Sequence, residues 1–528
     1  MPDRPNFLVI ITDQLHPGCL GYAGHPAVRT PNIDALAAGG RIFSRMYSNQ
    51  PLCMPTRATL FTGLTPRGHR VRMNGIPLDP SIPTFTEALR QAGYRTHCCG
   101  KIHLNVGGEV HGDVGEGSHG VGLEALDPAD FPERCGLWLD GKITDLPSPY
   151  YGLESADFYG GCAHGSYGPY LDWLRREHPD QAHLFFDRVL LEQPTGAMRL
   201  FNRNSYKWAL PAALHPATWI ADRTIDFLRA AGERPFFLMC SIQEPHPPFA
   251  PPAEYCNRHD PKDVPPPLGR DGELDDLPPH FRQMAEGEVV TSGNPGEPMN
   301  ATKPFRAECA AHYYGLIELV DDQVGRVLAA LRESGREDDT VVIFMADHGE
   351  ALGDHGMWGK GPYHFDSVIR VPFVVRWPGR PEAGSTHDGV VSLLDFAPTI
   401  LDIAGVPIPE GLVPDAPEAP QAPPAWPGRS LVAELTGQRD DPDATALVEM
   451  DEDYLGFKMR TLVTRRYRLT CYSGRPYGEL FDLREDPNEY RNLWDDPACR
   501  ELRDRLRLQL LDKIMQTDIS LPRQISRA

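Results

Sequence analysis

The sequence of 528 residues predicts an α/β fold in which a large, mostly parallel central sheet is flanked by helices. Short β-branched and apolar runs alternate along the chain with longer amphipathic segments, which is the pattern of parallel strands joined by covering helices. The chain is also longer than one hydrophobic core usually serves. We therefore expect a large α/β domain over residues 1–430 and a small C-terminal α+β subdomain with a short antiparallel sheet over residues 440–528.

The expected elements follow one another in order. Compact apolar runs predict strands, and apolar residues three or four positions apart predict helices. The predicted strands are residues 7–11, 235–240, 340–345 and 371–377, and the predicted helices are residues 33–39, 84–92, 217–231 and 313–334.

The remaining segments are less regular. Residues 107–203 and 251–304 are rich in Gly, Pro and charged residues, so we expect long excursions that shape the mouth of a pocket. Residues 413–427 are rich in Pro and Ala and predict an irregular connector. Residues 447–469 and 479–483 predict antiparallel strands, and residues 497–516 predict a helix that packs on them.

The composition excludes several classes of partner. The formal charge of −21 argues against a general affinity for nucleic acid or acidic membranes, so an anionic substrate would need local positive charge. Eleven cysteines without Cys-x-x-Cys spacing suit reduced thiols better than a disulfide framework. The N-terminal apolar run is too short for a signal peptide. The sequence also contains no uninterrupted apolar stretch of about 20 residues, which is the length needed to span a membrane. We expect a cytoplasmic protein.

Polar residues follow two of the predicted strands directly. Asp13 and Gln14 come after the first strand, and Asp347 and His348 come after the strand at residues 340–345. Either pair alone could terminate a strand or cap a helix. In open parallel sheets, however, ligands gather at the carboxyl ends of strands, and oxygen donors with an imidazole suit Ca²⁺, Mg²⁺ or Mn²⁺. We interpret the two pairs as ligands of one divalent cation.

A third motif lies between these pairs, where the chain reads Cys53-Met-Pro-Thr-Arg57 and continues to Thr-Gly at residues 62–63. Alone, it could be a buried structural cysteine before a proline turn. It resembles the signature of the sulfatase family, which directs oxidation of the cysteine to formylglycine. Further family motifs occur in the family's order, at residues 30–34, 100–103, 245–248, 347–349, 360 and 479–489.

The resemblance implies an alkaline-phosphatase-like fold and the hydrolysis of sulfate esters through a formylglycine made from Cys53. The hydrate of this aldehyde has two hydroxyls on one carbon, so one can attack sulfur and the other can later expel sulfate. The implied ligands of one Ca²⁺ or Mn²⁺ ion are Asp13, Gln14, Cys53, Asp347 and His348. The implied partners are a small-molecule sulfate ester and, during maturation, a formylglycine-generating enzyme. Whether the chain forms a homo-oligomer is left open.

The resemblance also implies roles for the remaining polar residues. Lys101 and Lys360 would bind sulfate oxygens, and Lys360 or His246 would protonate the departing alkoxide. His103 would remove the hydrate proton in the second step. His246 would also contact the substrate.

Two further residues complete the expected site. Arg57 lies about one helical turn beyond Cys53 and would hold the hydrate and the oxygens beside the metal. Asn74 resembles a sulfate-contacting asparagine, although Asn-Gly is also a strong turn signal.

The subgroup is indicated by four positions. Gln14 and His348 resemble the residues that choline sulfatases and phosphonate monoester hydrolases have at these positions. Gln14 removes one negative charge from the metal site and His348 adds a softer donor, which favours Mn²⁺ as a competitor of Ca²⁺. Lys101-x-His103 resembles true sulfatases and favours sulfate esters. The alternative is a promiscuous phosphonate monoester or phosphodiester hydrolase with the same nucleophile. A rival of another class is a metal-binding protein in which Cys53 stays a thiol.

Overall fold

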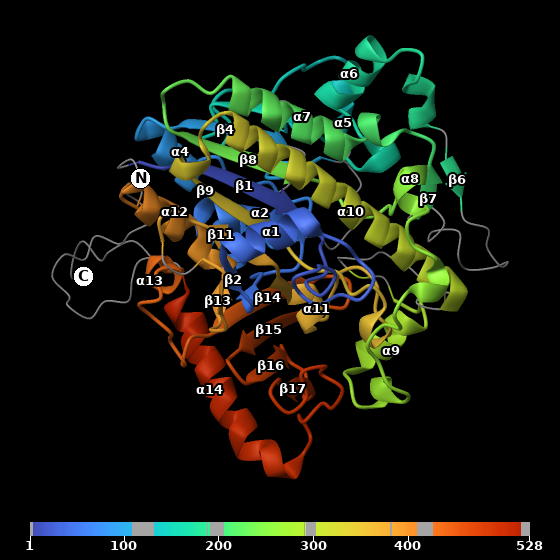
Figure 1. Ribbon diagram of the computed structural model, residues 1–528. Helices are drawn as coiled ribbons and strands as arrows, with labels where there is room; N and C mark the ends of the chain where they lie inside the picture. Colours follow the sequence, from blue (N-terminus) through green and yellow to red (C-terminus); the bar gives the residue numbers. More distant parts are fainter. Residues whose placement is uncertain are drawn as a thin grey trace.

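The computed structural model describes residues 4–107, 131–186, 188–190, 205–289, 291, 303–380, 383–408 and 426–518. The main part of the structure is a large sheet covered by helices on both faces. A smaller sheet with a long C-terminal helix lies beside it (Figure 1). The predicted connector at residues 413–427 lies outside the described residues except for its last two positions.

The large sheet has eight strands in the order β12-β2-β11-β9-β1-β8-β4-β5. Its strands are β1 (Asn6–Thr12), β2 (Arg41–Phe43), β4 (Arg95–Gly100), β5 (Ser155–Phe158), β8 (Phe236–Ile242), β9 (Thr340–Ala346), β11 (Phe373–Arg376) and β12 (Ser385–His387). The block from β9 to β5 is parallel, β12 is parallel to β2, and β11 is antiparallel to both of its neighbours. The predicted mostly parallel sheet is confirmed.

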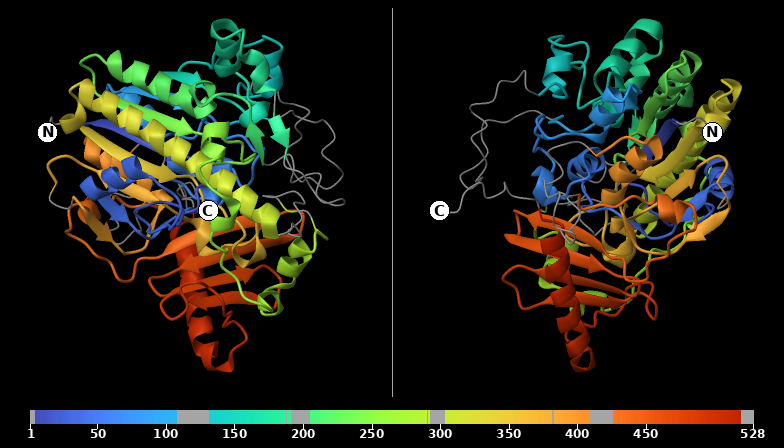
Figure 2. Two further views of the ribbon diagram at one scale, coloured as in Figure 1. Left: turned by 45° about the vertical axis from the view of Figure 1, so that its right-hand side comes forward. Right: turned by 90° about the vertical axis from the view of Figure 1, so that its left-hand side faces the viewer.

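Helices cover both faces because successive residues of a strand point in opposite directions. Phe236 of β8 contacts Phe227 of α7 (Pro216–Arg229) on one face. Phe237 contacts Phe85 of α4 (Phe85–Gln91) on the other, and Phe85 also meets Phe396 of α12 (Phe396–Ala404). The long helix α10 (Lys303–Glu333) packs beside α7, as Figure 2 shows.

All eight predicted elements of the main domain have counterparts, with one correction. The predicted strand at residues 371–377 is two strands in different sheets, β10 (Arg370–Val371) and β11, separated at Pro372. Proline has no N–H to donate to a ladder and therefore ends β10. The predicted helix at residues 33–39 is α1 (Pro31–Gly39), and the one at residues 313–334 is the longer α10.

The predicted excursions contain more regular structure than expected. The first contributes β5, the outermost strand of the large sheet, together with α5 (Cys135–Leu139) and α6 (Pro169–Glu177). The second contributes the short helices α8 (Ala253–Cys256) and α9 (Pro279–Ala285). The edge of the sheet nearest β4 is therefore built from a segment whose sequence shows no strand pattern.

The C-terminal part forms an antiparallel sheet of four strands, in the order β14-β15-β16-β17. Its elements are β14 (Ala446–Glu452), β15 (Phe457–Val463), β16 (Tyr467–Tyr472), β17 (Gly478–Asp482) and helix α14 (Arg500–Gln516). Leucines of all four strands pack with Trp494, Leu506 and Leu510 in one apolar cluster. The predicted strands and terminal helix are confirmed. Among the described residues, no helix combines the length and apolar composition that crossing a membrane requires.

Candidate active site

Four neighbouring strands bring polar residues together at one edge of the large sheet. Asp347, Asp13 and Lys101 directly follow β9, β1 and β4, and Ser241 lies near the end of β8. The register pairs Thr12 with Ala346 and Gly100 with Ser241, so these four ends lie side by side. The carboxyl ends of parallel strands therefore form the site, as expected for this type of sheet.

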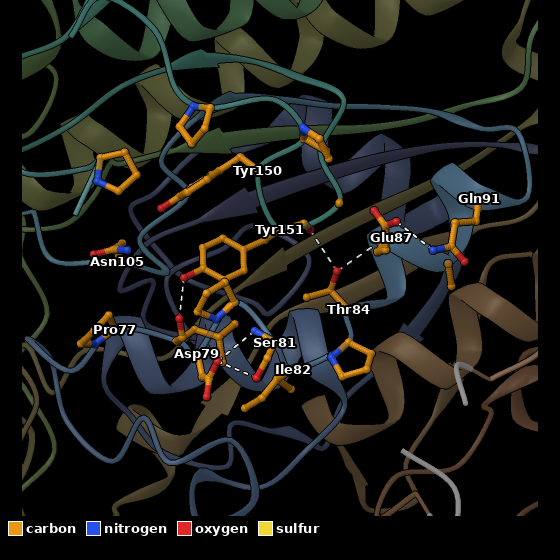
Figure 3. A pocket seen from close by; sticks show the side chains of 18 of the residues that line it. Pro77, Asp79, Ser81, Ile82, Thr84, Glu87, Gln91, Asn105, Tyr150 and Tyr151 are labelled. Carbon is orange, nitrogen blue, oxygen red and sulfur yellow. Dashed lines mark hydrogen bonds between the residues drawn. The ribbon is translucent and has the colours of Figure 1, made fainter. Parts of the chain in front are cut away.

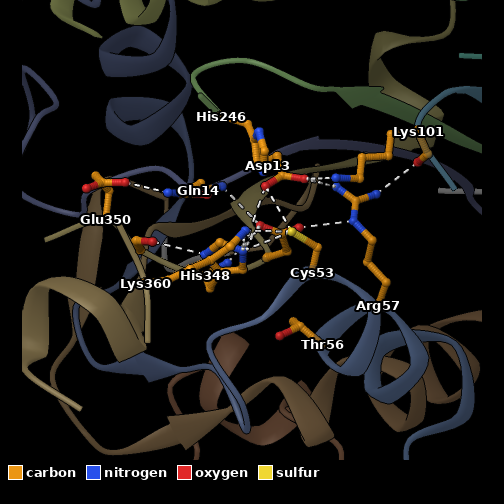
Figure 4. A network of polar contacts seen from close by, with 12 residues as sticks. Asp13, Gln14, Cys53, Thr56, Arg57, Lys101, His246, His348, Glu350 and Lys360 are labelled. Carbon is orange, nitrogen blue, oxygen red and sulfur yellow. Dashed lines mark hydrogen bonds and ion pairs between the residues drawn. The ribbon is translucent and has the colours of Figure 1, made fainter. Parts of the chain in front are cut away.

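Two of these side chains, Asp13 and Asp347, join Cys53 and His348 in a group that could hold one cation. The atoms of Asp13, Cys53, Asp347 and His348 all lie within 4.8 Å of one another, and all four residues are buried (Figure 4). His348 Nε2 lies 3.7 Å from Asp13 Oδ1 and 3.7 Å from Asp347 Oδ1. Two carboxylates and an imidazole around one point form a donor set suited to a divalent cation.

Gln14 completes this donor set. The residue adopts φ of 62°, which turns the chain directly after Asp13, and its N–H donates to Asp347 Oδ1 at 3.1 Å. Its side-chain Nε2 donates to Glu350 Oε2 at 2.5 Å. Among the residues that the structure describes, its buried Oε1 atom has no hydrogen-bond partner. A buried oxygen without a donor is costly, and a cation would satisfy it.

Cys53 begins the buried helix α2 (Cys53–Thr62), and its sulfur lies inside the cluster. The Sγ atom is 3.5 Å from Asp13 Oδ1, 3.3 Å from His348 Nε2 and 2.8 Å from Lys360 Nζ. Burial raises the pKa of the Cys53 thiol, but the charges of Lys101 and Lys360 outweigh burial and hold it well below its ordinary value. This position therefore favours a negatively charged group.

Arg57, one turn along α2, joins the strand ends. Its Nε donates to Asp347 Oδ2 at 3.0 Å, and its Nη1 donates to the Lys101 carbonyl and to Ser241 Oγ, both at 2.9 Å. Its Nη2 lies 3.6 Å from Asp13 Oδ2. The guanidinium is fully buried, so it offsets the two carboxylates without water. Ser241 was not predicted, because an isolated serine within an apolar strand carries no sequence signal.

Lys101 neutralises the other oxygen of Asp13. Its Nζ lies 2.5 Å from Asp13 Oδ2. Burial and the neighbouring Cys53 raise the pKa of Asp13, yet the nearby cations, led by Lys101, hold it below its ordinary value. Lys360 approaches from the other side, with its Nζ 3.1 Å from His348 Nε2. The acidic chain thus concentrates positive charge here.

The two predicted catalytic histidines differ in protonation. Burial, reinforced by the charge of Lys101, lowers the pKa of His103 to about 4. Burial and Lys360 lower the pKa of His246, but Asp13 and contacts with two thiols raise it to about 9. Near neutral pH, His103 is therefore a neutral base and His246 a cationic acid.

Two acidic residues that the sequence did not single out form hydrogen bonds to residues of this site. Glu350, fully buried, accepts from Gln14 as described above. Glu133 accepts from the N–H groups of His103, Leu104 and Asn105 at 2.8 to 3.0 Å. Glu350 follows Asp-His-Gly directly, which is the only signal for it, whereas Glu133 lies within a predicted excursion.

Asn74 stands apart from the other predicted residues. It is exposed, and its Oδ1 accepts from the N–H of Met54 at 3.0 Å in the first turn of α2. The structure therefore places it beside the start of the Cys53 helix, and all other predicted site residues converge on the cluster.

A large cavity lies elsewhere. It has a volume of about 1630 Å³, is lined by prolines together with Tyr150 and Tyr151, and includes none of the predicted site residues (Figure 3). Asn105 lies on its wall, two residues beyond His103. Cavity size therefore does not identify the site, whereas the convergence of charged side chains does.

The fold and this site define a hydrolase of the alkaline phosphatase superfamily. The crystal structure of the phosphonate monoester hydrolase of Agrobacterium radiobacter resembles the chain with a TM-score of 0.73 and 27% identity, covering 98% of this chain and 96% of that one. The chain belongs to the sulfatase family, since the family model described as Sulfatase matches residues 5–124 and 165–406.

Two sulfatases of this family match nearly the whole chain. An arylsulfatase of Clostridium perfringens (strain 13 / Type A) is 28% identical over 97% of this chain and 94% of its own length. The choline-sulfatase of Rhizobium meliloti (strain 1021) is 26% identical over 94% of this chain and 83% of its own length. The predicted family, fold and enzyme class are thereby confirmed.

Proposed function

We propose that the chain hydrolyses sulfate esters with a formylglycine made from Cys53 and one divalent cation. One observation carries the proposal: the Cys53 side chain lies within 3.5 Å of Asp13 Oδ1, 3.3 Å of His348 Nε2 and 2.8 Å of Lys360 Nζ. A nucleophile at this point has a metal-binding carboxylate on one side and a cation for a sulfate oxygen on the other.

The residues fit the groups that the family implies. Asp13, Gln14, Asp347 and His348 would hold a Ca²⁺ or Mn²⁺ ion, since no hydrogen bond from the described part of the chain uses the buried ligand oxygen Oε1 of Gln14. The ion would supply Lewis acidity, and the formylglycine hydrate would supply two hydroxyls on one carbon.

The chain's own side chains divide the remaining work. Lys101 and Lys360 bind sulfate oxygens as point charges. His246, with its pKa raised to about 9, donates a proton to the departing alkoxide oxygen. His103, with its pKa lowered to about 4, accepts a proton from the nucleophile's second hydroxyl. Arg57 positions Asp13 and Asp347, and Asn74 contributes a sulfate contact at the start of α2.

A second activity is favoured by the metal ligands. Gln14 and His348 match the pattern of phosphonate monoester hydrolases, and one of the similar solved structures bears that name. We propose a promiscuous phosphonate monoester or phosphodiester activity that is secondary, because Lys101-x-His103 follows the sulfatase pattern. Turnover of an aryl sulfate and of a phenyl phosphonate under matched conditions tests this order, and a higher kcat/KM for the phosphonate would reverse it.

Maturation and organisation complete the proposal. A formylglycine-generating enzyme would oxidise Cys53, and a mass spectrum of the peptide around Cys53 tests whether the thiol is lost. None of the eleven cysteines, all of which lie in the described parts of the chain, forms a disulfide, which supports a cytoplasmic, reducing location. The separate apolar cluster of the C-terminal sheet supports a division into a catalytic domain over residues 1–430 and a subdomain over residues 440–528.

A further inference from the structure

A second group of metal-ligand side chains lies at the outer edge of the large sheet. His97 and Cys99 are two residues apart on β4, so they share one face of the sheet, and Asp157 of β5 is the register partner of Cys99. Helix α7 covers this face, with the Phe227 ring stacked on His97 at 4.8 Å. The three residues belong neither to the active-site cluster nor to any step proposed above.

The three ligand atoms lie close enough together to share one cation. Asp157 Oδ2 lies 3.0 Å from His97 Nε2 and 3.8 Å from Cys99 Sγ, and all three atoms lie within 4.8 Å of one another. Bonds of about 2.0 to 2.3 Å around Zn²⁺ place neighbouring tetrahedral ligands about 3.3 to 3.8 Å apart. The two contacts of Asp157 lie within a few tenths of an ångström of this range, and the bound of 4.8 Å on the third pair of atoms leaves room for a cation between them.

The surroundings supply what such a site needs. His97 Nδ1 lies 2.7 Å from Ser155 Oγ, so the serine can accept from Nδ1–H and leave the Nε2 lone pair facing Asp157. Cys99 is fully buried, whereas the Asp157 side chain is 38% exposed, which gives an ion and a water ligand access from solvent. A thiolate with an imidazole selects Zn²⁺ over Ca²⁺ or Mn²⁺.

We propose that His97, Cys99 and Asp157 form a Zn²⁺ site that fastens the short edge strand β5 to β4. Binding releases the Cys99 thiol proton to solvent, and the imidazole proton moves from Nε2 to Nδ1 while Ser155 turns from donor to acceptor. No oxidation or reduction occurs. Lys101 follows Cys99 by two residues and comes directly after β4, so the site also steadies the strand end that precedes the lysine proposed to bind sulfate.

The competing explanation is a hydrogen-bond network without metal, in which His97 and Cys99 both donate to Asp157 and Ser155 donates to His97. Co²⁺ distinguishes the two, because a bound thiolate produces a charge-transfer absorption. We would titrate Co²⁺ into the Cys53→Ala/Asp347→Ala protein, in which the active-site thiolate and one active-site carboxylate are gone. The titration should show one thiolate-bound equivalent.

Cys98 provides a matched control, since it is equally buried on the same strand but points to the opposite face. Adding Cys99→Ser should abolish the absorption, whereas adding Cys98→Ser should leave it intact. Asp157→Asn keeps the shape of a partly exposed side chain, and it should weaken Zn²⁺ binding at least tenfold.

Metal analysis of the otherwise unsubstituted chain gives a second reading that needs no altered active site. After equilibration with Zn²⁺, Cys99→Ser should hold one equivalent fewer than Cys98→Ser. Equal zinc contents in these two variants, or no thiolate absorption in the titrated protein, would overturn the proposal and leave the hydrogen-bond network.

Discussion

Replacing Glu350 with glutamine should turn the amide of Gln14 away from the cation that we propose it binds. Glu350 Oε1 accepts from the N–H groups of Leu352 at 2.9 Å and Gly359 at 2.5 Å, and Oε2 accepts from Gln14 Nε2 at 2.5 Å. The amide oxygen of a glutamine would stay where two N–H groups point at it. Its NH₂ would then face the NH₂ of Gln14, and two donors cannot pair.

The Gln14 amide should respond by rotating, which turns its oxygen toward the new glutamine and its NH₂ toward the cation. Loss of a residue that orients a metal ligand typically weakens metal binding about 10- to 100-fold, or about 1.4 to 2.8 kcal/mol. Competition titration with a chelator measures this loss directly for Ca²⁺ and Mn²⁺. Circular dichroism would show that the fold is retained.

The coupling between the two residues gives the sharper test. In a Gln14→Ala background the ligand oxygen is already gone, so Glu350→Gln should weaken metal binding little further. Glu479→Gln is the matched control, because Glu479 is an equally buried carboxylate that pairs with Arg468 in the C-terminal sheet. Unchanged metal affinity in Glu350→Gln, or the same loss with and without Gln14, would refute the reasoning.

Further predictions concern the residues that we propose for catalysis and metal binding. Cys53→Ala and Cys53→Ser should both abolish multiple turnover, with Ser giving at most one sulfated product per chain by mass spectrometry; sustained turnover by Cys53→Ser would exclude the formylglycine mechanism. Asp347→Ala should lose metal and activity together while keeping its fold, and full metal occupancy would contradict the ligand assignment. His246→Ala should slow the hydrolysis of alkyl sulfates about 10²- to 10⁴-fold but that of nitrophenyl sulfate far less. His103→Ala should instead release a burst of alcohol and leave a covalent sulfate trapped on the enzyme. Because the pKa of His246 is raised above its ordinary value, turnover of alkyl sulfates by the unsubstituted enzyme should persist at neutral pH and fall at alkaline pH, where His246 loses its proton.

Three of the four strands that carry the site were predictable because each is a fully buried apolar run, whereas β4, with the sequence Arg-Thr-His-Cys-Cys-Gly, was not predicted. Residues of β1, β8 and β9 are buried throughout, so their sequences show the continuous hydrophobic character of central parallel strands. The polar residues just beyond them were therefore visible as strand ends. The order of motifs along the chain then pointed to the sulfatase family.

The elements and residues that the sequence did not predict share one physical cause. Their structure or role depends on contacts with distant parts of the chain rather than on a local sequence pattern. Strand β5 has the sequence Ser-Ala-Asp-Phe, and its strand conformation depends on pairing with β4. Glu350 and Ser241 act through Gln14 and Arg57, far away in sequence, and neither resembles a ligand by itself. The contact between Asn74 and the Met54 N–H likewise depends on the path of the loop.

The burial of Cys53 has a consequence for the maturation of the enzyme. The thiol is 1% exposed, and every residue of its helix is buried. An oxidising enzyme that must grasp the segment around Cys53 can reach it only before this helix is enclosed. Under the proposed chemistry, the fraction of active molecules is then set by two competing rates, that of oxidation and that of folding. A variant that folds faster but is equally stable would therefore contain a smaller fraction of molecules with an oxidised, catalytically competent Cys53.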